Sequence, residues 1–211
     1  MLLRVSQPPN LPLAPQQYGS QYQEQLNNVL RLYFNQISNV EGALLAPRGA
    51  KYLNAPYAAI QRTTDKTFTA NTVTQITFDQ NDYINGCVND GTDGIVVEQS
   101  GIYNYQFSVQ WKNTDSQEHD AWVWLRVNNV DVAGTGSQFT VPSKHGTVDG
   151  ALIAAANFFV ELQADQYVSM YAAVSNTAVT MDAAAAQTSP FAMPAIPSVV
   201  ATLSFVSCLL T

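Results

Sequence analysis

The most constraining feature of this sequence is the alternating run at residues 101–111, GIYNYQFSVQW. Apolar side chains occupy every second position, and mostly amide or hydroxyl side chains lie between them. Successive side chains of a β-strand point to opposite faces, so the run predicts a strand with one apolar and one polar face. The predicted apolar face, buried in a core or a subunit interface, consists of Tyr103, Tyr105, Phe107, Val109 and Trp111.

Residues 56–211 contain further short strand-like segments separated by polar turns, with no helical periodicity between them. This pattern predicts an all-β fold, a jelly-roll sandwich of about ten strands. Segment 78–86 has the composition of a turn-containing loop. The other predicted strands are 94–98, 121–127, 130–133, 151–156, 158–162, 167–174, 179–181 and 199–207.

Both faces of segment 121–127 are apolar, which predicts burial on two sides. Val123 and Leu125 lie on the face expected in the core. Trp122 and Trp124 lie on the opposite face, and aromatic residues of this kind are enriched at subunit interfaces. The two tryptophans are therefore expected either at a subunit interface or under a loop of their own domain.

Residues 1–19 are rich in proline, which fixes φ and removes amide donors. They are predicted to form an extended arm without a core of its own. The arm residues expected to dock on another protein are Pro8, Pro9, Leu11, Pro12, Leu13 and Pro15.

Residues 20–42 are predicted to form the single helix, with a Ser20/Gln23 capping box at its start and Gly42 as its stop. Its apolar residues recur every three or four positions and define one stripe. This stripe is expected to pack either on the chain's own β domain or in a seam between identical chains. The predicted seam residues are Tyr22, Leu26, Val29, Leu30, Tyr33, Ile37 and Val40. A linker at 43–55 separates the helix from the jelly-roll knob at 56–211.

Charged residues make up only 12% of the 211-residue chain, about half the usual share, which suits a surface that neighbouring subunits cover. The net charge of −7 and the absence of a basic patch argue against nucleic-acid binding. The apolar tail at 199–210 is too short to cross a membrane, and residues 1–9 do not resemble a signal peptide. We therefore expect synthesis in the cytosol without export, with Cys87 and Cys208 as buried free thiols.

The sequence does not predict an enzyme. Its two histidines, His119 and His145, accompany neither a nucleophile elbow nor a zinc motif. The pairs Asp79/Asp82 and Asp90/Asp93 are better explained as turn residues than as a calcium site. No catalytic residue, cofactor or metal is predicted.

Three polar or small-residue segments are candidates for contact with a receptor or glycan. Segments 114–120 and 134–138 are expected to be loops at one end of the sandwich, and 182–187 is an exposed alanine-rich stretch.

Residues 101–111 and 123–132 (VWLRVNNVDV) resemble the paired core strands of the tumour-necrosis-factor and complement globular-head jelly rolls. Residues 159–168 (FVELQADQYV) resemble a further segment of that family, with Ala164 in place of its usual glycine. The resemblance implies a ten-stranded jelly roll that assembles as a tight homotrimer.

Residues 11–18 (LPLAPQQY) and 22–37 (YQEQLNNVLRLYFNQI) resemble the N-terminal segment of structural proteins from marine tailed bacteriophages, especially cyanophages. Residues 194–202 (PAIPSVVAT) resemble another phrase from that group. The resemblance implies a virion protein that is assembled in the host cytoplasm and contacts other virion proteins through residues 1–41. A tail fibre, a head fibre and a capsid decoration protein all fit, and the alternative is the receptor- or glycan-binding tip of a tail fibre.

Overall fold

The computed structural model describes residues 9–13, 19–45, 55–89, 91 and 94–209. The chain divides into two compact units, Met1–Asn54 and Ala55–Thr211. The predicted linker falls mainly on 46–54, outside the described residues, as do Pro8 and Pro15 of the predicted arm and the Asp90/Asp93 pair.

The first unit contains α1 (Ser20–Leu45), the one helix within the described part of the chain. The helix continues three residues past Gly42, so the predicted stop is wrong; Ala43, Leu44 and Leu45 are all good helix formers. The predicted capping box is also wrong, because Gly19, whose carbonyl accepts the first helical hydrogen bond, is the N-cap in place of Ser20; the Gln23 side chain donates to Asn27 Oδ1 at 3.1 Å. The first helical bond runs from the Gln23 N–H to the Gly19 carbonyl at 3.2 Å. No helix among the described residues is long and apolar enough to span a membrane.

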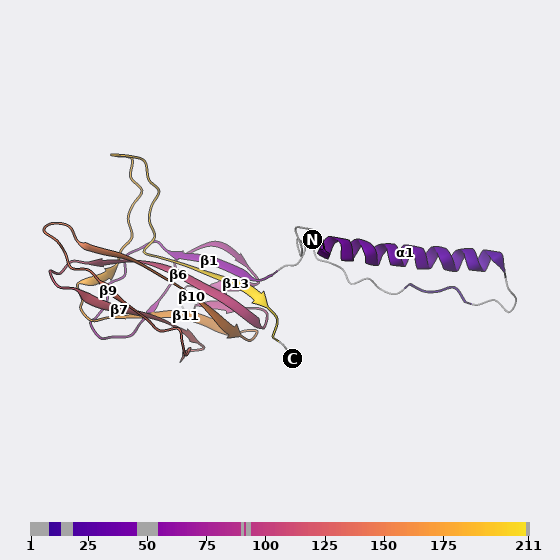
Figure 1. Ribbon diagram of the computed structural model, residues 1–211, viewed down its shortest axis with the longest axis horizontal. Helices are drawn as coiled ribbons and strands as arrows, with labels where there is room; N and C mark the ends of the chain where they lie inside the picture. Colours follow the sequence, from indigo (N-terminus) through magenta and orange to yellow (C-terminus); the bar gives the residue numbers. More distant parts are fainter. Residues whose placement is uncertain (1–8, 14–18, 46–54, 90, 92–93, 210–211) are drawn as a thin grey trace. The chain divides into compact units, whose positions relative to one another are not determined.

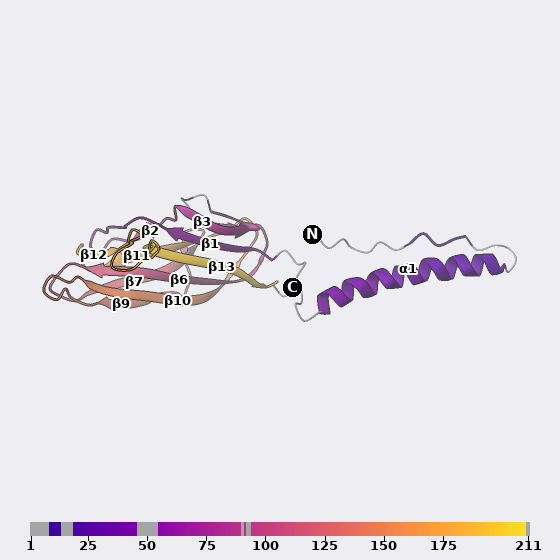
Figure 2. The same ribbon diagram turned by 90° about the horizontal axis from the view of Figure 1, so that it is seen from above.

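The second unit is a sandwich of two antiparallel sheets (Figures 1 and 2), and the predicted jelly-roll fold is confirmed. One sheet has six strands in the order β10-β6-β13-β1-β3, with β12 also paired to β6. The other has seven strands in the order β4-β5-β11-β7-β8, with β2 on β11 and β9 on β7. The strands are β1 (Tyr57–Arg62), β2 (Thr74–Ile76), β3 (Gln80–Asn85), β4 (Cys87–Asn89), β5 (Ile95–Val97), β6 (Gly101–Asn113), β7 (His119–Val127), β8 (Val130–Asp131), β9 (Ser137–Val141), β10 (Gly150–Leu162), β11 (Tyr167–Val174), β12 (Val179–Met181) and β13 (Val199–Ser207).

Strand β6 is the centre of the core, as its alternation predicts. All five residues of its predicted apolar face are at most 3% exposed: Tyr103, Tyr105, Phe107, Val109 and Trp111. The strand begins at a glycine because the ring of Phe205 lies against its backbone; a Cβ on Gly101 would be 2.3 Å from Phe205 Cε2. These positions therefore form the core of one sheet and pack against the inward residues of the other.

Several strand predictions differ from the structure: β1 and β4 were not predicted as strands, and β7 begins at His119, in a segment predicted as a loop. Residues 80–85, predicted as loop, form the edge strand β3, whose backbone pairs with β1 although its side chains are largely exposed. Residues 151–156 and 158–162, predicted as two strands, form one 13-residue strand, β10, which pairs along the whole length of β6. Strand β9 begins in a segment predicted as a loop. In each case pairing with a neighbouring strand outweighs weak local propensity.

Candidate functional site

The outer face of the seven-stranded sheet carries the aromatic residues that the sequence placed opposite the core. Ala121, Val123 and Leu125 of β7 are fully buried, whereas Trp122, Trp124 and Arg126 are only half-buried on the opposite face. The register with β11 places Tyr171 beside Trp124 and Ala173 beside Trp122.

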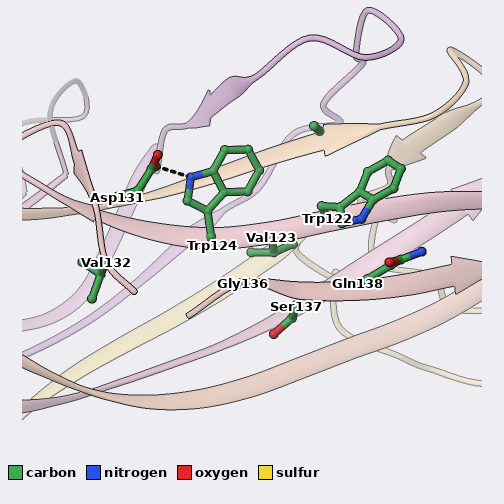
Figure 3. A pocket seen from close by; sticks show the side chains of 9 residues that line it. Trp122, Val123, Trp124, Asp131, Val132, Gly136, Ser137 and Gln138 are labelled. Carbon is green, nitrogen blue, oxygen red and sulfur yellow. Dashed lines mark hydrogen bonds between the residues drawn. The ribbon is translucent and has the colours of Figure 1, made fainter. Parts of the chain in front are cut away.

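Trp124 is fixed by three neighbours. Its indole N–H donates to Asp131 Oδ1 at 2.7 Å (Figure 3), and its ring stacks on Tyr171 with centroids 6.3 Å apart. The Arg126 guanidinium lies 4.2 Å from the Tyr171 ring centroid, and its Nε donates to the same Asp131 oxygen at 2.6 Å. Hydrogen bonds from Arg126 and Trp124 lower the pKa of Asp131, so this carboxylate stays ionised below the usual range for aspartate.

A groove of about 650 Å³ opens over these residues. Figure 3 shows the Trp122 and Trp124 rings on the same side of β7, with Asp131 at the far side of Trp124 and Gln138 near Trp122. The groove is lined by Trp122, Val123, Trp124, Asp131, Val132, Gly136, Ser137, Gln138 and Ala173.

The groove depends on how the chain turns after β7. Asn128 and Asn129 both adopt positive φ, 48° and 65°, and return the chain as β8, which brings Asp131 opposite Arg126. The buried Thr135 hydroxyl then accepts from the Leu125 N–H at 3.1 Å and donates to the Val132 carbonyl at 2.8 Å. Residues 134–138 therefore lie along the edge of β7, and their predicted position at the end of the sandwich is wrong.

The outer face of the six-stranded sheet is different in character. The register of its five main strands defines three cross-strand rows that contain no charged residue. Its exposed apolar side chains include Ile153 and Phe159, each 65% exposed, and Tyr83, 70% exposed. The rows are Gln80–Gln61–Val200–Ser108–Ala155, Tyr83–Ala59–Thr202–Gln106–Asn157 and Asn85–Tyr57–Ser204–Asn104–Phe159.

A hairpin between β12 and β13 stands away from the sandwich on the side of the six-stranded sheet (Figure 1, yellow-brown). Two β-bridges hold its arms together, Ala184 with Ile196 and Gln187 with Met193. Residues 183–197 contain no charge, and Phe191 at the tip is 61% exposed. At the base of the hairpin a hollow of about 180 Å³ adjoins the ion pair between Lys112 and Asp182, which raises the pKa of Lys112.

The titratable residues near the two histidines are engaged in local structural pairs. His119 Nε2 lies 2.8 Å from Asp115 Oδ2, and this hydrogen bond, together with one from the Ser116 N–H, lowers the pKa of Asp115. His145 is exposed, and Asp149 pairs with Lys144 at 3.4 Å. Within the described ranges, no three His, Cys, Asp or Glu residues are grouped as metal ligands.

Two turn residues considered for calcium also have protein partners. Asp79 accepts hydrogen bonds from the Thr63 N–H at 2.8 Å and from two threonine hydroxyls. Asp82 Oδ1 accepts from the side chains of Gln61 and Gln80 at 2.8 and 3.0 Å.

The two cysteines are both free thiols, but only one is buried. Cys87 is 4% exposed on β4, and burial, followed by the charge of Glu98, raises its pKa to about 11. Cys208 follows β13 and is exposed, so its predicted burial is wrong.

In the first unit, the predicted seam residues lie on one stripe of α1. The members of the stripe, Tyr22, Leu26, Val29, Leu30, Tyr33, Ile37 and Val40, are all half-buried, and none of the described side chains of the helix is fully buried. Leu11 and Leu13 of the arm are 53% and 95% exposed. Both segments thus present apolar side chains, which their sequence periodicity and composition predicted.

Comparison with known proteins finds similar chains among solved structures alone. No protein-family model matches the sequence, and no curated protein is significantly similar to it. Among solved structures, the globular domain of zebrafish complement 1qA is similar with a TM-score of 0.44 and 10% identity, over 74% of this chain and 99% of that domain. Murine APRIL is similar with a TM-score of 0.44 and 13% identity, over 72% of this chain and 99% of that chain. Both similarities span the β-sandwich, and at these identities they concern fold alone.

Proposed function

We propose that this chain is a homotrimeric structural protein of a bacteriophage particle, in which the arm and helix fasten a jelly-roll knob to the virion. The observation that carries the assembly is the middle of the outer face of the six-stranded sheet, where three cross-strand rows contain no charged residue; Glu161, Lys112 and Asp82 lie at the margins of this area. These rows, with exposed Phe159 in one of them and exposed Ile153 beside them, can be covered by another copy without burying an unpaired charge.

The projecting hairpin supports the same interface. It rises from the side of that sheet, carries no charge and exposes Phe191 at its tip. An apolar projection of this kind gains stability only by contact with another surface, and a neighbouring copy offers one next to the sheet face. We propose three copies because residues 101–111 and 123–132 resemble jelly rolls that assemble as trimers.

The virion role rests on the resemblance of residues 11–37 to phage structural proteins and on the exposed apolar residues of the arm and helix. Leu11 and Leu13 suit an extended segment that lies in a groove of another virion protein. The helical stripe suits a seam between the three helices. In this arrangement the protein has a structural role, with neither catalysis nor a cofactor.

The stoichiometry is tested on the full chain by sedimentation equilibrium and light scattering. A particle of three times the 23.0 kDa chain mass is expected, and a stable monomer at micromolar concentration overturns the proposal. Gold-labelled antibody to the chain, applied to phage particles, tests the location; particles without label contradict the virion role but leave the trimer standing.

The helical seam has its own test with a matched control. Leu26→Asp places a charge on the stripe and is expected to weaken the trimer, whereas Leu32→Asp, at a residue off the stripe and 61% exposed, is expected to leave it unchanged. Equal effects of the two substitutions on the trimer would show that the helix is not part of the interface.

A further inference from the structure

The groove over β7 has the form of a binding platform because small residues flank its two large rings. Trp122 faces Ala173 on β11, and Gly136 lines the groove at the start of β9. A Cβ added at Gly136 would meet no atom within 4 Å, so the space beside the rings is open. Residues two apart on a strand are about 7 Å apart, a spacing comparable with one sugar unit of an oligosaccharide.

One ring of the platform is held in place before any ligand arrives. Trp124 is fixed by its hydrogen bond to Asp131 and by stacking on Tyr171, whose hydroxyl donates to Asn129 at 3.0 Å. Fixing a contact residue in advance reduces the entropy lost on binding.

The polar groups at the groove also define the ligand. Asp131 Oδ1 accepts from both Trp124 and Arg126, and Oδ2 has no hydrogen-bond partner among the described residues. Gln138 lies opposite Trp122 and offers an amide donor and acceptor. Within the described part of the chain, the cation that contacts the groove residues is Arg126, and it is already engaged by Asp131 and by the Tyr171 ring.

From this arrangement we infer that the groove binds a neutral oligosaccharide, which stacks the C–H faces of its sugar rings on Trp122 and Trp124. The electron-rich faces of the indoles suit the weakly positive C–H groups of a pyranose. Hydroxyl groups of the sugar donate to Asp131 Oδ2 and exchange hydrogen bonds with Gln138. An anionic polysaccharide is disfavoured because Asp131 is ionised and no free cation opposes it.

A protein partner fits this surface less well. The six-stranded sheet has uncharged middle rows with exposed apolar residues for assembly. Covering the β7 face would instead desolvate the exposed side of Asp131, 64% accessible, with only the Arg126 cation beside it. The inference is independent of the number of subunits and of the particle on which the protein resides.

The test titrates the full chain with cellohexaose, maltohexaose and N-acetylchitohexaose, which are neutral, and with an alginate hexamer, which is anionic, by calorimetry and tryptophan fluorescence. Trp111 is 2% exposed, so a change in emission reports on Trp122 and Trp124. Binding of at least one neutral hexamer is expected, with alginate weaker. Trp122→Ala should weaken binding about tenfold, and Trp122→Phe should retain part of it.

Gly136→Leu provides a second variant that leaves both tryptophans in place. Its φ is not in the left-handed region and its Cβ has free space, so the fold should be retained while the leucine fills the groove and weakens binding. Tyr83→Ala, which removes an exposed aromatic from the other sheet, is the matched control and should bind as the parent does.

Three results would overturn the inference. The first is no calorimetric or fluorescence response to any neutral hexamer at millimolar concentration. The second is binding that survives both Trp122→Ala and Gly136→Leu. The third is dissociation of the oligomer by Trp122→Ala, which would assign the groove to a protein interface.

Discussion

The two sheets of the sandwich bury equivalent cores but present different outer faces. The six-stranded sheet exposes three uncharged rows with separate apolar side chains, Tyr83 and Phe159, at two of their ends. The seven-stranded sheet exposes an ordered cluster in which Trp124, Arg126, Tyr171 and Asp131 contact one another. A face without charge suits burial by another protein surface, whereas a fixed aromatic cluster beside an ionised carboxylate suits a small polar ligand. One fold can thus separate assembly from recognition.

The largest expected effect is loss of assembly when the uncharged face is given charge. Ile153→Asp combined with Phe159→Asp places two carboxylates in the proposed interface, where each would be desolvated without a partner. We expect the trimer to dissociate to monomers at micromolar concentration, measured by sedimentation velocity.

The control for this double variant is Val148→Asp, at a residue of similar exposure, 70% against 65%, in the loop before β10. It should remain trimeric. If the double variant also remains trimeric, the distinction between the two faces is lost.

The next effect concerns the two thiols: Cys87 on β4 of the seven-stranded sheet, and Cys208 directly after β13 of the six-stranded sheet. At pH 8 the thiolate fraction of Cys87, with its pKa near 11, is roughly a hundredfold below that of an ordinary cysteine, and burial blocks access as well. We expect iodoacetamide to label Cys208 rapidly and Cys87 only after unfolding, as measured by peptide mass spectrometry. Rapid labelling of Cys87 in the native protein would mean that the edge of the seven-stranded sheet opens.

The faces of the two sheets differ in how well they could be predicted from the sequence. The alternation of residues 101–111 predicted the buried side of β6 residue by residue, because a strand's period of two is a local property. The same rule placed Trp122 and Trp124 opposite the core. The partners of these tryptophans could not be predicted, since Tyr171 and Asp131 reach them only through strand pairing and the turn at Asn128 and Asn129.

The uncharged rows of the six-stranded sheet could not be predicted from local sequence either. Each of its rows combines residues from five strands that are far apart in sequence, such as Tyr57, Asn104 and Phe159. Low overall charge indicated that a surface of this kind exists, but only the strand order shows where it lies. Strand β3 was missed because an edge strand with exposed amides resembles a loop in composition.

A smaller effect is expected from removing the ring that supports the aromatic cluster. Tyr171→Ala deletes a side chain that is 7% exposed, stacks on Trp124 and lies beneath Arg126. We expect the free energy of unfolding to fall by about 2–3 kcal/mol in urea denaturation. Tyr83→Ala on the other sheet should change it by less than about 0.5 kcal/mol, because Tyr83 is 70% exposed. Similar losses of unfolding free energy for the two variants would show that the aromatic cluster does not stabilise the fold.

The smallest effect is a pH dependence confined to the groove. Arg126 first, and then Trp124, lower the pKa of Asp131 below its ordinary value of 3.8 through hydrogen bonds to the ionised form. The contribution of this group to stability is therefore fully present above the ordinary pKa and is lost as the pH falls through the lowered one. In NMR titration, the Trp124 indole N–H signal should keep its shift through pH 3.8 and move only at lower pH, whereas the Trp122 signal should not follow it. In Asp131→Asn, which cannot ionise, the Trp124 signal should lose this transition; a transition that persists in the variant would assign it to another carboxylate.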